Sequence, residues 1–328
     1  MNDLLRKIME KREKLKTHRP ISPEVLKNLD AWFKIELTYT SNAIEGNTLT
    51  RQETALVVEK GLTVAGKSLT EHLEAINHAG ALEYIKKLVS KKKKDITEKD
   101  ILNIHNIVLS KIDDTNAGRY RNVPVRIAGS RVVLPNHGKI PQLMSEFIAW
   151  LHKKTDTQLL QFAADAHFKL VSIHPFVDGN GRTARLLMNL LLMQDGYPPA
   201  LIRKEDRLLY INAIEKGQLH GAMDNYYKII YESVDRSLNI YLKAVEQKET
   251  HQLLRLEKFL KIGELAKASG ETVPTIRYWT TEGLLRVASR TPGGYQLYAP
   301  AMIELAKKIR QLQKEKRLTI AELKNFTF

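Results

Sequence analysis

The sequence of 328 residues contains no cysteine. Disulfide bonds and thiolate metal sites are therefore excluded, and the composition indicates a reducing compartment. No apolar run is long enough to cross a bilayer, because the best one, residues 186–193, is short and is interrupted by Asn189. The first residues, MNDLLRKIMEKREKLK, are charged throughout and lack the apolar core of a signal peptide. We therefore expect a cytoplasmic protein with no membrane partner.

The chain is long enough for two or three domains, and 43% of its residues are hydrophobic. Its net charge of +15 is unevenly distributed. Residues 255–328 contain 14 Lys and Arg against 7 Asp and Glu, a net charge of +7. We therefore interpret residues 255–328 separately from residues 1–254.

Residues 174–185 read HPFVDGNGRTAR. Pro175 disfavours a helical conformation at His174 and favours an extended or loop conformation there. From Gly181 the sequence RTARLLMNLLLMQDG has no helix breaker until Gly196 and is apolar on most sides, so it predicts a buried helix. Residues 179–181 then lie at a helix N-terminus, where free N–H groups and the helix dipole bind anions.

The charged residues of this stretch suit a polyphosphate ligand. Arg182 and Arg185 are three positions apart, so they share a helix face and can each fork a phosphate group. Asp178 offers the oxygen that Mg²⁺ prefers. His174, which titrates near neutral pH, is placed to take a proton from a hydroxyl nucleophile.

These twelve residues match the motif HxFx(D/E)GNGRxxR of the Fic family at every defined position. The resemblance implies a protein adenylyltransferase, which moves AMP from ATP to a hydroxyl side chain of a target protein and releases pyrophosphate. It implies that His174 is the general base, that Phe176 is a buried anchor, and that Asp178 holds Mg²⁺ on the α- and β-phosphates.

The same resemblance assigns the contacts to the nucleotide. Asn180 and the surrounding amides, with the flanking Gly179 and Gly181, would bind ATP and stabilise its α-phosphate in the transition state. Arg182 and Arg185 would bind the outer phosphates. Relatives that act as kinases carry lysine where this chain has Gly181, so glycine favours nucleotidyl transfer. Phosphocholine transfer, also known in the family, stays open.

A second motif, SNAIEG, lies in TYTSNAIEGNTLT at residues 38–50. Ser41 and Glu45 are four apart and share a helix face, and Gly46 with Asn47 predicts that the helix ends there, with Glu45 in its last turn. A carboxylate at the negative end of a helix dipole favours a nearby cation. The stretch resembles the Fic inhibitory motif (S/T)xxxE(G/N), whose glutamate pairs with the second arginine of the active-site motif, here Arg185. The alternative is a solvated glutamate at the end of a surface helix.

Residues 119–134 predict a short hairpin. Val123, Val125 and Ile127 alternate with other residues, Gly129 and Ser130 turn the chain, and 132–134 follow. In the Fic family this segment resembles the flap that docks an extended piece of the target by strand pairing. An ordinary hairpin that covers the core is the alternative.

The lysine run at residues 91–94 precedes DITEKDILNIHNIVL, where Thr97 could cap a helix with Asp100 three positions on. We interpret the run as a solvated loop and not as a binding patch. Tyr210, Tyr226 and Tyr227, in the helical stretch that follows residue 200, are interpreted as core, with adenine contacts or modified sites as the alternative.

The basic tail predicts a helix-turn-helix followed by a wing. Apolar residues at helical spacing on both sides of Gly270 give two short helices. Residues 285–290 and 295–298 flank TPGG and predict a hairpin. Further helices are expected at 301–316 and in TIAELKNF at 319–326.

IGELA, TIRYW, EGLL and GGYQLY resemble the winged helix-turn-helix of the MerR family of transcription regulators. The resemblance places Arg277 and Tyr278 on the recognition helix, and Arg286 and Arg290 beside the wing, where they would meet DNA phosphates.

Two positions depart from the MerR pattern, since Pro274 and Gln296 stand where basic residues are common. Three interpretations of the tail therefore stay open. It binds duplex DNA, it grips a protein target, or it is a structural or dimerising domain.

We predict a mainly α protein, an all-helical Fic fold with a short β-hairpin flap and a small winged helix-turn-helix domain. The expected regions are 1–95 with the inhibitory motif, a catalytic core at 96–250, and the MerR-like domain at 251–328. Expected ligands are ATP and Mg²⁺. The expected partner is a target protein with a Ser, Thr or Tyr hydroxyl, and duplex DNA and a second copy of the chain are further candidates. The alternative function is a DNA-binding regulator whose Fic site senses nucleotide without turnover.

Overall fold

The computed structural model describes residues 2–92, 95–153, 158–246, 259–290, 294–315 and 318–324. The chain divides into two compact units. The first comprises Met1–Thr48 and Ser68–Thr250, and the second comprises Leu49–Lys67 and His251–Phe328. The predicted boundary between residues 250 and 251 falls within 247–258, which lie outside the described residues. The predicted domain boundaries therefore stay predictions.

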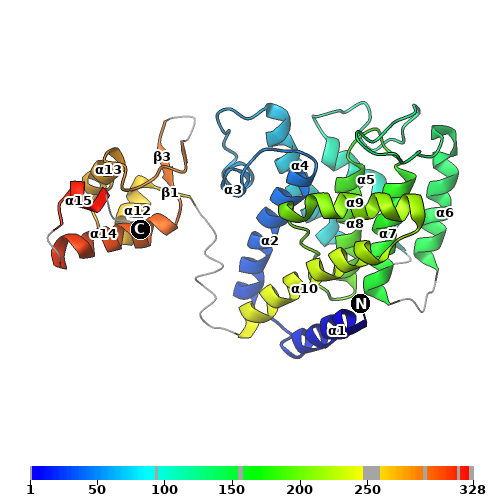
Figure 1. Cartoon of the computed structure of the whole chain (residues 1–328), viewed down its shortest axis with the longest axis horizontal. Helices are drawn as coiled ribbons and strands as arrows, with labels where there is room; N and C mark the ends of the chain where they lie inside the picture. Colours follow the sequence, from blue (N-terminus) through cyan, green and yellow to red (C-terminus); the bar gives the residue numbers. More distant parts are fainter. Residues whose placement is uncertain are drawn as a thin grey trace. The chain divides into compact units, whose positions relative to one another are not determined.

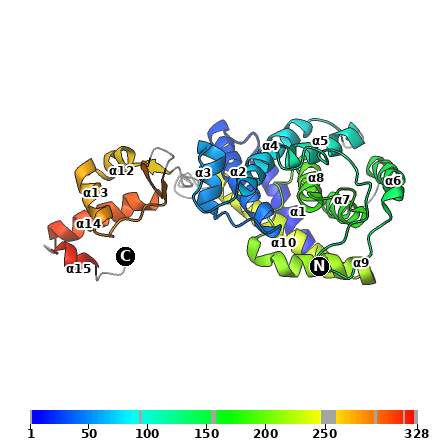
Figure 2. The ribbon, with the colours of Figure 1, turned by 90° about the horizontal axis from the view of Figure 1, so that it is seen from above.

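Helix α8 (Asn180–Gln194) is the centre of the first unit. It contacts α7 (Leu159–Ile173), α5 (Glu98–Leu109), α4 (Leu69–Leu88) and α2 (Pro23–Ile44). In both Figure 1 and Figure 2, α8 lies between α5 and α7. The apolar sequence after the glycine-rich stretch explains this position, because a helix that is apolar on most sides is stable only when other helices surround it. The predicted buried helix is therefore confirmed.

The remaining helices cover this centre. Helices α1 and α10 pack against each other, α10 also contacts α2 and α7, and α6 packs on α7. Their bounds are α1 (Asn2–Thr17), α6 (Ile140–His152), α9 (Arg207–His220) and α10 (Asp224–Glu246), with the 3-10 helices η2 (His137–Lys139) and η3 (Lys204–Asp206) before α6 and α9.

Side-chain caps set the starts of several helices. Thr97 caps α5, and Asp100 reaches back to the Thr97 N–H, which confirms the predicted capping box. Lys91 donates to the Asp100 carboxylate at 2.9 Å, so the first residue of the lysine run is anchored to this cap, whereas Lys92 is exposed. Residues 93 and 94 of that run lie outside the described residues.

The predicted hairpin at residues 119–134 is only partly correct. Gly129 has a φ of 77° and the Ser130 N–H donates to the Ile127 carbonyl, so the chain turns where expected. The segment nevertheless contains no β-strand, and its two arms form no backbone ladder. The physical reason is that side chains bind the backbone of the segment in place of strand pairing, namely Arg121 from within it and Glu215 from α9, as described for the candidate site below.

The second unit contains α3 (Arg51–Lys60) and a winged helix. Helix α3 begins with a capping box between Thr50 and Glu53 and ends at Gly61, which adopts the left-handed conformation that favours glycine. In the winged helix, α12 (Ile262–Ser269) is followed by Gly270, also left-handed, and α13 (Val273–Thr281) begins after the three-residue turn 270–272. This confirms the predicted helix-turn-helix.

A three-stranded antiparallel sheet completes the winged helix. Strand β3 (Gln296–Tyr298) lies between β1 (Leu260–Lys261) and β2 (Ser289–Arg290). The β2–β3 pair is the predicted wing, with Arg290 opposite Gln296, although its tip at residues 291–293 lies outside the described residues.

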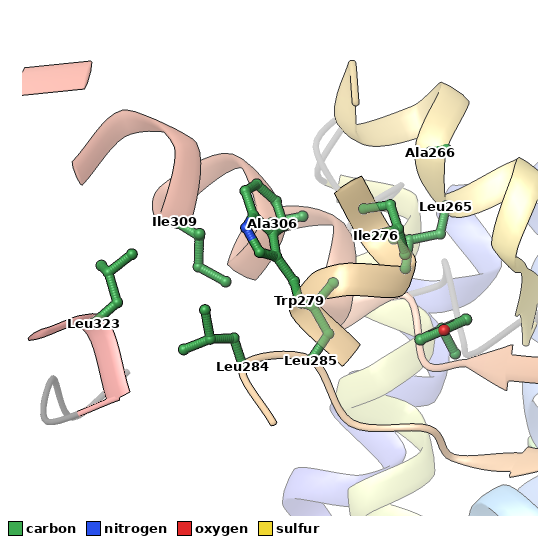
Figure 3. Close-up of a cluster of buried hydrophobic side chains, with 10 residues drawn as sticks. Leu265, Ala266, Ile276, Trp279, Leu284, Leu285, Ala306, Ile309 and Leu323 are labelled. Atoms are coloured by element: carbon green, nitrogen blue, oxygen red, sulfur yellow. The ribbon is translucent and has the colours of Figure 1, made fainter. Parts of the chain in front are cut away.

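Helices α14 (Ala301–Glu315) and α15 (Ile320–Lys324) follow the sheet, close to the two predicted ranges. Apolar side chains from both helix pairs and from the sheet meet in one cluster (Figure 3). Its members include Leu265, Ala266, Ile276, Trp279, Leu284, Leu285, Tyr298, Ala306, Ile309 and Leu323. The mainly helical fold class is thus confirmed for both units. Within the described residues, no helix has the length and apolar character needed to cross a membrane.

Candidate active site

His174 stands at the C-terminal end of α7 with φ 51° and ψ 59°, the left-handed conformation. The expectation that Pro175 takes the histidine out of the helix is correct, but the backbone is left-handed and not extended. This conformation is uncommon for a residue with a side chain, and such backbone is concentrated at functional sites. The His174 N–H still donates to the Leu170 carbonyl at 3.0 Å, which holds the ring at the helix end.

The tautomer of His174 follows from its one hydrogen bond. Nδ1 lies 3.3 Å from the Val171 carbonyl oxygen, which can only accept, so Nδ1 carries the proton and Nε2 carries the lone pair. Burial lowers the pKa of His174 below its ordinary value of 6.5, and Arg121 nearby acts in the same direction. The ring is therefore neutral at neutral pH and is suited to accept a proton at Nε2.

The loop between His174 and α8 is held by Asn180. Its side chain accepts from the Phe176 N–H and donates to the Phe176 carbonyl, both at 2.9 Å. Phe176 is fully buried. The side-chain amide of Asn180 therefore shapes the loop, and since its Nδ2 has a second hydrogen, the phosphate contact that the resemblance implied stays a prediction.

The N-terminus of α8 has no side-chain cap, unlike α2, α4 and α5. Its first N–H groups therefore remain available to an anion. Gly179 is left-handed, and a Cβ there would crowd the His105 ring. A Cβ on Gly181 would collide with the carboxylate of Glu45, which shows that this carboxylate lies directly beside the helix N-terminus.

The two arginines of α8 occupy different environments. Arg182 is 2% exposed and donates to Glu74 at 2.8 Å and to Asp178 at 2.9 Å. The Asp178 side chain is 67% exposed, so it stands between Arg182 and solvent. The buried Arg182 therefore holds the exposed Asp178 carboxylate through a hydrogen bond. The position of Arg182 on the helix face did not predict this contact.

Arg185 is 5% exposed and is held by Ser41 and Glu45. Its Nε donates to Ser41 Oγ and its Nη2 to the Ser41 carbonyl, both at 2.9 Å, and Nη2 also donates to Glu45 Oε1 at 2.7 Å. Glu45 is the C-cap of α2, one position beyond the last turn that we predicted. The two motifs, 140 residues apart, therefore meet as the resemblance implied.

Sequence reasoning missed His105 on α5. Gly118 N–H donates to its Nδ1 at 3.0 Å, so Nε2 carries the proton and donates to the Asp178 carbonyl at 2.9 Å. The ring stacks on Phe176 with centroids 3.6 Å apart and planes 6° apart. Burial lowers the pKa of His105 to about 4, which keeps this neutral form. A histidine on an apolar helix face gives no sequence signal for such a role.

Arg121 and Glu215 were also missed. Arg121 donates to the carbonyls of His174 and Pro135, at 2.8 and 2.6 Å. It thereby joins the segment 121–135 to the loop at residues 174–179, called the catalytic loop below. Glu215 on α9 accepts from the Ser130 hydroxyl and the Arg131 N–H, at 2.9 and 2.8 Å. These contacts hold the ends and the turn of the segment and replace the strand pairing that we predicted.

The residues present fit Mg²⁺ only together with a nucleotide. Within the described residues, no group of three or more His, Asp or Glu side chains could hold a metal ion. Asp178 uses Oδ2 for Arg182 and exposes the rest of its carboxylate. One carboxylate with substrate phosphates is a common way of binding Mg²⁺.

In the winged helix, the side chains that the resemblance assigned to DNA all face solvent. Arg277 and Tyr278 on α13 are exposed, and so are Arg286 before the wing and Arg290 in its first strand. Pro274 lies in the first turn of α13, where its missing N–H has no cost.

Residues 95–192, which include the catalytic loop and α8, match the profile described as the Fic/DOC family. Two solved structures agree over most of the chain. A Fic domain-containing signaling protein from Bacteroides thetaiotaomicron has a TM-score of 0.67 and 30% identity, with 73% of this chain and 97% of that chain covered. Fic-1 (residues 134–508) from C. elegans has a TM-score of 0.69 and 31% identity, with 75% and 72% covered. The chain belongs to the Fic/DOC family.

The Protein adenylyltransferase Fic of Nematostella vectensis is 39% identical to this Fic protein over 246 residues, or 74% of this chain and 56% of the relative. The chain spans about half the length of the curated relatives it matches. Residues 260–327 match the profile described as MerR HTH family regulatory protein, which confirms the resemblance of the C-terminal region.

Proposed function

We propose that this Fic protein transfers AMP from ATP to a Ser, Thr or Tyr hydroxyl of a target protein. The observation that carries the proposal is the catalytic loop, which brings the free Nε2 of His174 and the uncapped N-terminus of α8 into one site. Its relatives named protein adenylyltransferase support the same chemistry. Gly181 favours nucleotidyl over phosphoryl transfer.

In the proposed reaction, Nε2 of His174 takes the proton of the target hydroxyl. The hydroxyl oxygen attacks the α-phosphorus, the bond from that phosphorus to the bridging oxygen breaks, and pyrophosphate leaves. The N–H groups of residues 179–181 stabilise the negative charge that develops on the α-phosphate oxygens. Asp178 would hold Mg²⁺, which neutralises phosphate charge when it is bound with ATP.

Glu45 is proposed to restrain this reaction. Its carboxylate pairs with Arg185 beside the N-terminus of α8, where the outer phosphates of ATP would lie. Two anions cannot share that position without a large electrostatic cost. A productive pose of ATP therefore requires Glu45 to move away.

The segment 123–134 is proposed to dock the target. It turns at Gly129, forms no backbone ladder of its own, and exposes Val133 and Val123. Arg121 joins it to the catalytic loop, so an extended target segment that pairs with it lies next to His174.

The experiment that tests the function compares ATP labelled at the α-phosphate with ATP labelled at the γ-phosphate. The full chain with Glu45→Gly is incubated with each nucleotide, Mg²⁺ and a cell lysate, and protein-bound label is counted. Label from the α-phosphate alone supports AMP transfer, provided that the His174→Ala variant, folded by circular dichroism, gives none. Label from the γ-phosphate alone identifies a kinase, and label from neither favours a nucleotide sensor.

A second function, binding of duplex DNA, is proposed for the winged helix. The four exposed side chains on α13, before the wing and in its first strand, together with the net charge of +7 in residues 255–328, favour it. If the Fic site binds nucleotide without turnover, the protein is a DNA-binding regulator instead of an enzyme.

A further inference from the structure

Helix α9 lies beside the ion pair between Glu45 and Arg185. Its first residue, Arg207, reaches the end of α2, and Tyr210, one turn later, reaches Arg185. The two contacts come from one helical turn, because residues three apart lie on the same face of a helix.

Arg207 stabilises the end of the inhibitory helix. Its Nε donates to the Ile44 carbonyl at 2.6 Å. The N–H groups of Glu45, Gly46 and Asn47 all bond to earlier carbonyls, so the Ile44 carbonyl receives none of them. A cation at the C-terminus of a helix satisfies such a carbonyl and interacts favourably with the helix dipole. Arg207 therefore fixes the backbone of the residue directly before Glu45.

Tyr210 orients Arg185 through a directed chain of hydrogen bonds. The Tyr226 hydroxyl donates to the Ala164 carbonyl at 2.7 Å, so its oxygen accepts from Nδ1–H of His167 at 2.8 Å. Nε2 of the neutral His167 then accepts from the Tyr210 hydroxyl at 2.6 Å. The Tyr210 oxygen is left as an acceptor, and its electrostatic interaction with Arg185 raises the pKa of that arginine.

Every side chain of this hydrogen-bond network is buried. Burial lowers the pKa of His167 to about 3, so its ring stays neutral. The direction of each hydrogen bond is therefore determined. A buried chain of this kind holds its members in one arrangement, because no water replaces a broken hydrogen bond.

We infer that Arg207 and Tyr210 are positioning residues that align the two partners of the Glu45–Arg185 pair. Arg207 sets where Glu45 stands, and Tyr210 sets where the guanidinium of Arg185 points. The inference rests on the proposed function, since it assigns the pair a role in AMP transfer. It predicts that Arg207 strengthens the restraint, whereas Tyr210 serves both the restraint and the binding of ATP by Arg185.

The first test measures AMP transfer from ATP labelled at the α-phosphate, with and without the inhibitory carboxylate. With Glu45 present, Arg207→Ala should raise the rate about tenfold, in keeping with the loss of a hydrogen bond from a charged donor. With Glu45→Gly it should change the rate by less than about twofold. Arg207→Lys, which keeps a cationic donor, should restore the restraint. Arg203→Ala, which removes a half-exposed arginine of the neighbouring turn, is the matched control.

An equal change in both backgrounds, or no change with Glu45 present, overturns the role of Arg207. Absence of label from every Glu45→Gly protein contradicts the proposed function instead. In that case the inference is tested by urea unfolding of the parent protein, of Arg207→Ala, of Glu45→Gly and of the double variant. Non-additive losses of stability support an alignment of Glu45 by Arg207, and additive losses overturn it.

The second test concerns Tyr210. In the Glu45→Gly background, Tyr210→Phe should raise the KM for ATP about tenfold and leave kcat within about twofold. The reason is that the substitution misaligns Arg185, which binds a phosphate of ATP, and removes no group that reacts. Tyr227→Phe is the control, since the Tyr227 hydroxyl donates to Asp165, which is not part of this hydrogen-bond network. Equal effects of the two substitutions overturn the role of Tyr210.

Discussion

Glu45 Oε1 accepts a hydrogen bond from Nη2 of Arg185 at 2.7 Å, although the two residues are 140 positions apart. This contact brings a carboxylate from the end of α2 to the N-terminus of α8. The inhibitory hypothesis depends on it, and so do the first two predictions.

Replacing Glu45 by Gly should raise AMP transfer by about tenfold or more, because a partly buried charged hydrogen bond contributes about 1.5–3 kcal/mol. Initial rates with ATP labelled at the α-phosphate measure this. Glu45→Gln, which keeps the size but not the charge, should give a smaller rise. An unchanged or lower rate in folded Glu45→Gly protein would contradict the restraint.

Ser41→Ala should have a weaker effect of the same sign. It removes the hydroxyl that accepts from Arg185 Nε but leaves the Ser41 carbonyl and Glu45 in place. Since one hydrogen bond to a charged group is lost among three, we expect a rise of about threefold to tenfold. A larger rise than that of Glu45→Gly would mean that Ser41, and not the carboxylate, restrains the enzyme.

The pH dependence of the Glu45→Gly enzyme should report His174. Burial lowers its pKa below 6.5, and a general base works in its neutral form, so activity is retained down to the lowered pKa and is lost as the pH falls through it. The acidic midpoint of kcat/KM against pH should therefore lie below 6.5. A midpoint above that value would assign the base to another group.

His105→Phe should separate packing from hydrogen bonding at the catalytic loop. The phenyl ring can keep the stack on Phe176, but the Gly118 N–H and the Asp178 carbonyl lose their partner. We expect a loss of about 2 kcal/mol in the free energy of unfolding and a lower rate of AMP transfer. Urea unfolding and label incorporation measure the two effects, and unchanged values for both would contradict a role for His105.

Arg277→Ala should weaken binding to duplex DNA and reduce the slope of log affinity against log salt concentration by about one, as expected for a phosphate contact. Fluorescence anisotropy with a random duplex pool measures both quantities. Arg203→Ala, which removes one positive charge from the other unit, is the control. No binding at low salt would leave the winged helix with another role.

Much of the fold was predictable because its signals are local. The capping box of Thr97 and Asp100, the break at Gly270 and the apolar sequence of α8 each act within a few residues. The hairpin prediction was wrong about strand pairing because that depends on distant partners. Glu215 binds the turn of this segment from α9, Arg121 joins the segment to the His174 carbonyl, and alternation along the segment says nothing about either contact.

The sequence by itself determined the chemistry of the site, since twelve consecutive residues contain the histidine, the aspartate, the glycines and both arginines. Only the tertiary structure decided how these groups are used. It directs the Asn180 amide to the loop, places Arg182 behind Asp178, and joins Arg185 to Glu45. The physical reason is that a local motif sets which groups are present, whereas their hydrogen-bond partners and burial come from helices far apart in the chain.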